Sequence, residues 1–79
     1  MSRDPRVDPR PGDVVQRAGS CIITDTVDHI TTTGGIVCAV VFQYPDRDDA
    51  DYTTRSPYEW RGKMRDATIL HTAEAPDAE

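Results

Sequence analysis

The chain has 79 residues, of which 37% are hydrophobic and 29% are charged, and its net charge at pH 7 is −5. A chain of this length forms one small domain, and its negative charge disfavours generic binding of the whole molecule to nucleic acid or to an anionic membrane. No stretch approaches the roughly 18 apolar residues of a membrane span, and the N-terminus lacks a hydrophobic signal core, so we expect a cytoplasmic protein.

Proline and charge set the expected limits of the folded domain. Residues 1–10 combine two prolines with five charged residues, which is typical of a flexible, extended N-terminal arm. The Pro-Gly-Asp sequence at 11–13 predicts a turn that opens a single domain over residues 11–73. Residues 74–79 are expected to form an acidic C-terminal tail.

The first half of the domain has the composition of short antiparallel strands. We expect strands at 14–17 and 21–27, where β-branched residues alternate with polar ones. Asp28 and His29 both tolerate positive φ, and they predict a two-residue hairpin turn into a further strand at 30–33.

The longest apolar run of the chain lies at 36–42 and predicts a central strand. The run is bounded by Gly34-Gly35, which would form a bulge, a bend or a second hairpin. Its even and odd positions are both apolar, so each face of this strand needs a cover. One face would fill the core, and the other would contact a helix, the N-terminal arm, another subunit or a partner protein.

The segment 44–57 is rich in aspartate and carries little that could be buried, so we expect a long acidic loop. Ser56 followed by proline, with Glu59 three residues after it, has the spacing of a helix capping box. This spacing predicts a short helix over 57–65, and a last strand is expected at 68–72.

Five short strands with one short helix before the last strand define the expected fold class. The pattern is typical of a small, SH3-like, partly open five-stranded barrel. We therefore expect a mainly β protein.

Three short motifs resemble those of small SH3-like proteins encoded by bacteriophages and prophages. They are Asp8 to Val15 with its Pro-Gly-Asp-Val sequence, Ser56 with Trp60-Arg61, and Ala67 to Leu70. The resemblance spans most of residues 8–73. It implies the same fold and a phage or mobile-element setting in the cytoplasm of a bacterial host. Small acidic phage proteins include inhibitors of bacterial defence systems, with anti-CRISPR proteins among them.

Candidate metal and catalytic residues do not form a specific motif. The acidic segment 46–51 lacks the ligand, glycine and glutamate positions of an EF-hand loop. Cys21, Cys38, His29 and His71 lack zinc-site spacing, and any Cys-His pair among them would have its nucleophile buried in a strand. We expect no cofactor and no enzymatic activity. The two cysteines are expected to be reduced, although a cross-strand disulfide stays open.

The acidic segment suits a partner protein with a basic surface. Its carboxylates would attract lysine and arginine side chains and mimic the phosphates of a nucleic acid. This is the preferred functional hypothesis, and its candidate partner-binding residues are Asp46, Asp48, Asp49, Asp51, Tyr44 and Tyr52.

Two other hypotheses use different parts of the chain. Aromatic and basic residues alternate on the expected helix, as in nucleic-acid-binding modules, although they would equally suit a helix that packs its aromatic side chain and solvates its charges. The candidate nucleic-acid-binding residues are Tyr58, Trp60, Arg61, Lys63 and Arg65. A structural or assembly role, for example as a homodimer, would use the two-sided apolar strand at 36–42.

Overall fold

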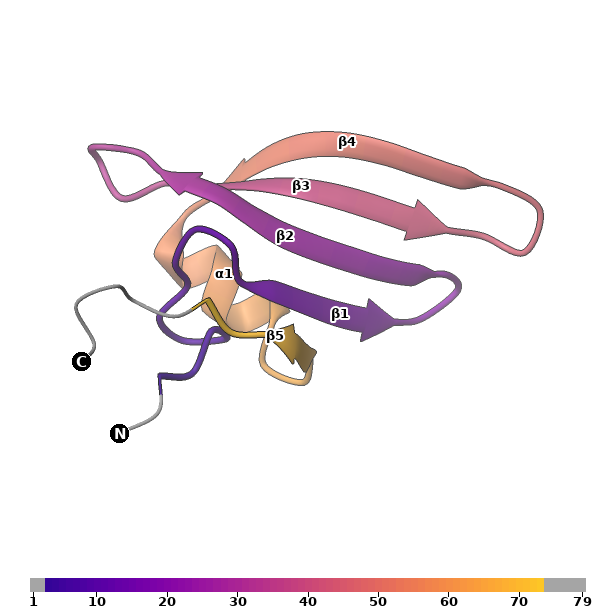
Figure 1. The fold of residues 1–79 in the computed structure, drawn as a ribbon, viewed down its shortest axis with the longest axis horizontal. Helices are drawn as coiled ribbons and strands as arrows, with labels where there is room; N and C mark the ends of the chain where they lie inside the picture. Colours follow the sequence, from indigo (N-terminus) through magenta and orange to yellow (C-terminus); the bar gives the residue numbers. More distant parts are fainter. Residues whose placement is uncertain (1–2, 74–79) are drawn as a thin grey trace.

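The computed structural model describes residues 3–73, which contain five strands and one short helix (Figure 1). The elements in chain order are β1 (Val14–Ala18), β2 (Ile22–Ile30), β3 (Ile36–Gln43), β4 (Asp48–Arg55), α1 (Pro57–Lys63) and β5 (Thr68–His71). The mainly β class and the position of the helix before the last strand are both confirmed. The predicted acidic tail, residues 74–79, lies outside the described residues.

The five strands form one antiparallel sheet in the order β4-β3-β2-β1-β5. The last strand returns to pair with the first, and β4 lies at the opposite edge (Figure 1). The two edges do not pair with each other, so the sheet is the partly open, five-stranded arrangement expected from the sequence. In the described part of the chain no helix is long and apolar enough to cross a membrane.

The prediction of a hairpin turn at Asp28 and His29 is wrong. Strand β2 continues through both residues to Ile30, and only a shift of register between Val27 and His29 marks the place. The reversal comes later, where Gly34 adopts the left-handed conformation with φ of 92° and the Gly35 N–H donates to the Thr31 side chain at 2.8 Å. Gly34-Gly35 therefore forms the hairpin, because glycine takes this conformation without steric cost. The separate strand expected at 30–33 does not exist.

The prediction of a long acidic loop over 44–57 is also wrong, because residues 48–55 form strand β4. A tight turn closed by the Tyr44 N–H and the Arg47 carbonyl at 2.8 Å leads directly into β4, which pairs with β3 in unbroken register. An edge strand exposed on most of its surface needs few apolar residues, so its sequence carries no hydrophobic periodicity.

The core lies between the sheet and α1. Its buried side chains are Val15, Val27, Ile36, Cys38, Val40, Trp60, Met64 and Ala67. The even positions of β3 face this core, whereas Val37, Ala39 and Val41 lie on the other face and remain partly exposed. The predicted two-sided apolar strand is thus covered on one side by the helix, and no described residue buries the other side.

The helix begins as the capping box predicts. The Ser56 side chain accepts a hydrogen bond from the Glu59 N–H at 3.1 Å, and proline occupies the first turn. The helix ends at Lys63, two residues before the expected end. Trp60 and Met64 are completely buried, which fixes α1 on the sheet.

A buried carboxylate, Asp13, joins the two ends of the domain. It accepts hydrogen bonds from both terminal nitrogens of Arg3, from the Arg10 N–H at 2.8 Å and from the Ala73 N–H at 2.6 Å. The N-terminal arm therefore contacts the domain from Arg3 onward. The Trp60 indole N–H adds a second anchor by donating to the Pro5 carbonyl at 2.9 Å.

A second buried carboxylate, Asp25, lies on the core-bearing face of β2. It accepts from Arg17 at 3.0 Å and from Arg55 at 3.2 Å, so the first, second and fourth strands share one ion-pair network. Both carboxylates are paired with arginine, as buried charges must be.

The Asp13 contacts predict a strong dependence of stability on this residue and on pH. Burial alone would raise the pKa of Asp13, but the Arg3 guanidinium and the Ala73 and Arg10 N–H groups outweigh it and hold the pKa below its usual value. Asp13→Asn should lower the free energy of unfolding by about 3 kcal/mol at pH 7. Because the folded-state pKa is depressed, the difference from the parent protein should shrink as pH falls below about 4.

Denaturant unfolding followed by circular dichroism checks this prediction. The control is Asp8→Asn, because Asp8 is exposed and pairs with Arg10 at 3.5 Å. This control should change stability by less than about 1 kcal/mol. Equal effects of the two substitutions would contradict a special role for Asp13.

Candidate partner-binding surface

The predicted partner-binding residues lie together on the β3–β4 hairpin. Its turn is at the end of the sheet remote from the Gly34 hairpin, and α1 lies on a different part of the sheet (Figure 1). Tyr44 is half-buried, and the other predicted members are exposed: Asp46, Asp48, Asp49, Asp51 and Tyr52. The hairpin therefore presents all four carboxylates to solvent.

One cation, Arg47, lies among these carboxylates and braces the turn. Its guanidinium pairs with Asp46 at 3.6 Å and with Asp49 at 3.3 Å, and it stacks over the Tyr44 ring at 4.3 Å from the ring centre. Asp48 and Asp51 have no ion-pair partner among residues 3–73. The hairpin consequently keeps a net negative charge in a defined conformation.

The strand register divides the carboxylates between the two faces of the sheet. Asp49 and Asp51 pair with Phe42 and Val40, which lie on the face that carries the core. Asp48 lies on the opposite face with Tyr52, because successive side chains of a strand alternate. The three aspartates of β4 thus border both sides of its edge, with Asp46 in the preceding turn, and they do not form one continuous array.

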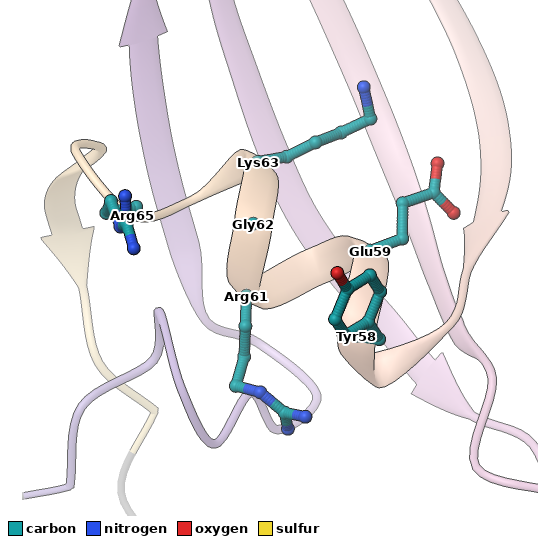
Figure 2. Close-up of a pocket in the computed structure, with 6 residues that line it drawn as sticks. All are labelled: Tyr58, Glu59, Arg61, Gly62, Lys63 and Arg65. Carbon is teal, nitrogen blue, oxygen red and sulfur yellow. The ribbon is translucent and has the colours of Figure 1, made fainter.

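The alternative nucleic-acid-binding residues are only partly available. Trp60 is completely buried and its indole N–H is engaged by Pro5, so it offers no face to a base. Tyr58 is 84% exposed. A shallow pocket on the outer side of α1 is lined by Tyr58, Glu59, Arg61, Gly62, Lys63 and Arg65 (Figure 2). In this view the Arg61 side chain extends downward and the Lys63 side chain extends to the upper right.

The candidate metal and thiol residues are scattered. Within residues 3–73 no group of three His, Cys, Asp or Glu side chains could hold a metal ion. The His29 ring contacts Asp28 at 2.7 Å near the C-terminal end of β2. Cys21 and Cys38 are not bonded to each other: Cys21 is half-buried at the sheet end, and Cys38 is in the core.

Three buried polar residues were missed by the sequence analysis: Asp13, Asp25 and Arg55. Asp13 belongs to the Pro-Gly-Asp turn, but nothing in the sequence indicates that its carboxylate binds Arg3 and Ala73. Arg55 ends the edge strand, and its Nε has no hydrogen-bond partner in the described structure. These residues are buried and do not contribute to the exposed hairpin surface.

Comparison with known proteins gives no relative for this chain, because no family model, curated protein or solved structure matches it.

The different burial of the two thiols predicts that only Cys21 reacts with an alkylating reagent in the folded protein. Burial raises the pKa of the Cys38 thiol to about 11, and the Asp25 carboxylate acts in the same direction. Because the thiolate is the nucleophile, iodoacetamide at pH 7.5 should modify Cys21 and leave Cys38 intact in the folded protein. Intact-mass spectrometry should show one adduct when folded and two in denaturant.

A Cys21→Ser variant is the control for this labelling. It should give no adduct when folded and one adduct after unfolding. Rapid labelling of Cys38 in the folded variant would contradict its burial under α1.

Proposed function

We propose that this protein is a non-enzymatic binding module that contacts a basic surface of another protein through its β3–β4 hairpin. The observation that carries the proposal is the exposure of four carboxylates at one edge of the sheet, those of Asp46, Asp48, Asp49 and Asp51. Arg47 is the one cation in the segment 46–51. Charges arranged in this way accelerate association with an oppositely charged partner and select against acidic ones.

The conformation of the hairpin adds to this argument. A tight turn, an unbroken register with β3 and the stacking of Arg47 on Tyr44 hold the carboxylates in place before any partner binds. Preorganisation lowers the entropy cost of association. The exposed Tyr52 ring, 66% accessible, offers an apolar contact beside the charges, as aromatic residues commonly do in interfaces.

The resemblance to small phage SH3-like proteins suggests which partners to test. A bacterial defence complex that binds nucleic acid presents lysine and arginine side chains to phosphates, and an acidic hairpin would compete for them. We therefore extend the proposal to inhibition of a host defence complex in the bacterial cytoplasm, as anti-CRISPR proteins do.

Neutralising the two aspartates without ion-pair partners tests this proposal. The double variant Asp48→Asn/Asp51→Asn should recover at least about tenfold less of a basic protein partner from nuclease-treated bacterial lysate at low salt. Quantitative mass spectrometry of the captured proteins gives the measurement. The reduction should diminish as salt rises, because exposed charges are screened.

The matched control is Asp8→Asn/Asp28→Asn, which changes the net charge by the same two units at exposed positions outside the hairpin. It should capture as much partner as the parent protein. Equal losses in both double variants would show that only overall charge matters and would remove the hairpin from the mechanism.

A second candidate function, nucleic-acid binding through α1, is favoured by one observation. Arg61, Lys63, Arg65 and the exposed Tyr58 border the same shallow pocket (Figure 2). Backbone contacts by three cations would give a salt dependence of binding with a slope of roughly −2 for a single strand.

Fluorescence anisotropy with a labelled single-stranded RNA at 50 mM salt tests this candidate. Replacing Arg61, Lys63 and Arg65 by glutamine should abolish binding, whereas Arg10→Gln should change it little. Trp60→Phe should leave binding unchanged, because the ring is buried. No binding by the parent protein at this salt concentration dismisses the candidate.

A further inference from the structure

The backbone of β4 has one row of hydrogen-bonding groups directed away from the sheet. The turn pairs Tyr44 with Arg47 through a backbone hydrogen bond, and bonded and non-bonded pairs alternate along an antiparallel ladder. Asp49, Asp51 and Thr53 therefore bond to β3. The N–H and C=O groups of the intervening residues, Asp48, Ala50, Tyr52 and Thr54, point outward.

An independent contact supports this assignment. The Tyr52 N–H donates to the carboxylate of Asp51 at 2.8 Å and so does not bond to β3. The Asp51 side chain thereby covers one of the outward donors.

The β4 edge lacks most of the features that prevent strand addition. Protected edges are short, bulged, covered, or interrupted by proline or by charged side chains, lysine above all, and of these features β4 has only its charged side chains. β4 has eight residues in continuous register, with no lysine or proline, and most of them are exposed. The other edge, β5, has only four residues, and its pairing with β1 is bulged.

Charge determines what kind of strand this edge accepts. β4 carries three aspartates, and its only cation, Arg55, is buried at its end. A second copy of β4 would place carboxylates opposite carboxylates, which is destabilising. An acidic edge therefore opposes self-pairing and favours a strand rich in lysine or arginine.

We propose that β4 accepts an extended basic segment of the partner protein as a sixth strand of the sheet. Lysine or arginine at alternate positions would lie beside Asp49 and Asp51 on the core-bearing face. Apolar residues between them would lie beside Ala50 and Tyr52 on the other face. When the strand adds, Asp51 releases the Tyr52 N–H to the new ladder and pairs with a cation. This inference rests on the proposed function and specifies how the hairpin binds.

A proline substitution separates backbone pairing from charge. Ala50→Pro removes an outward donor and places a ring on the edge while keeping every carboxylate and every hydrogen bond to β3. The probe is the capped heptapeptide KVKVKVK, with EVEVEVE as its charge-reversed counterpart. The parent protein should bind only the lysine peptide, and Ala50→Pro should weaken that binding by about tenfold or more. Ala50→Ser, which keeps the N–H, should bind as the parent does.

Asp49→Asn/Asp51→Asn is the charge counterpart in the same titration. Weaker binding in both this variant and Ala50→Pro supports strand addition. Weaker binding in the aspartate variant alone overturns strand addition while leaving the acidic surface of the proposed function intact. No binding of KVKVKVK by the parent protein also overturns it.

Amide hydrogen exchange gives a readout that requires no substitution. In the free protein the outward amides of Asp48, Ala50 and Thr54 should exchange quickly, and the lysine peptide should slow all three. Exchange of the Asp49, Asp51 and Thr53 amides, which already bond to β3, should change much less. Saturating peptide that leaves the three outward amides at their free rates overturns the proposal.

Discussion

The buried Asp13 carboxylate is the constraint on which the rest of the structure depends. A sheet of five short strands and a seven-residue helix can bury only a small core. Asp13 binds the N-terminal arm through Arg3 and Arg10 and binds the chain after β5 through Ala73. It thereby keeps Pro5 against Trp60 and the arm against the helix. An uncompensated charge at this position would cost more than most single contacts contribute.

The buried and the exposed carboxylates of this protein differ in how they are paired. The charged contacts around Asp13 and Asp25 are buried and paired with arginine. Those of the β3–β4 hairpin are exposed: Asp46 and Asp49 pair with Arg47, which stacks on Tyr44, whereas Asp48 and Asp51 have no ion-pair partner among residues 3–73. The buried aspartates stabilise the fold, and the exposed ones are those that we propose bind the partner. Substitutions on the hairpin can change binding without weakening the core, which makes the proposed function testable.

Much of the fold was predictable from local patterns, and the errors have physical causes. The apolar run of β3 and the Ser56–Glu59 capping box each determine local structure directly. β4 was missed because pairing with a neighbour, and not apolar periodicity, makes its residues a strand. Asp28 and His29 tolerate a turn, but the glycine pair that follows makes a better one. Asp13 contacts Ala73, which is 60 positions away in the sequence, and Trp60 contacts Pro5, which is 55 positions away. No local sequence pattern indicates contacts between residues so far apart.

The measurement that tests the account most directly is chemical-shift mapping of the isotope-labelled full chain with the protein partner captured from lysate. Two-dimensional NMR spectra report on every backbone amide, so they distinguish the two exposed surfaces in one titration. The account predicts shifts concentrated at residues 44–54, in the hairpin and along β4, with those of α1 unchanged. Shifts concentrated at Tyr58 to Arg65, with the hairpin unperturbed, would contradict it and assign binding to the basic helix.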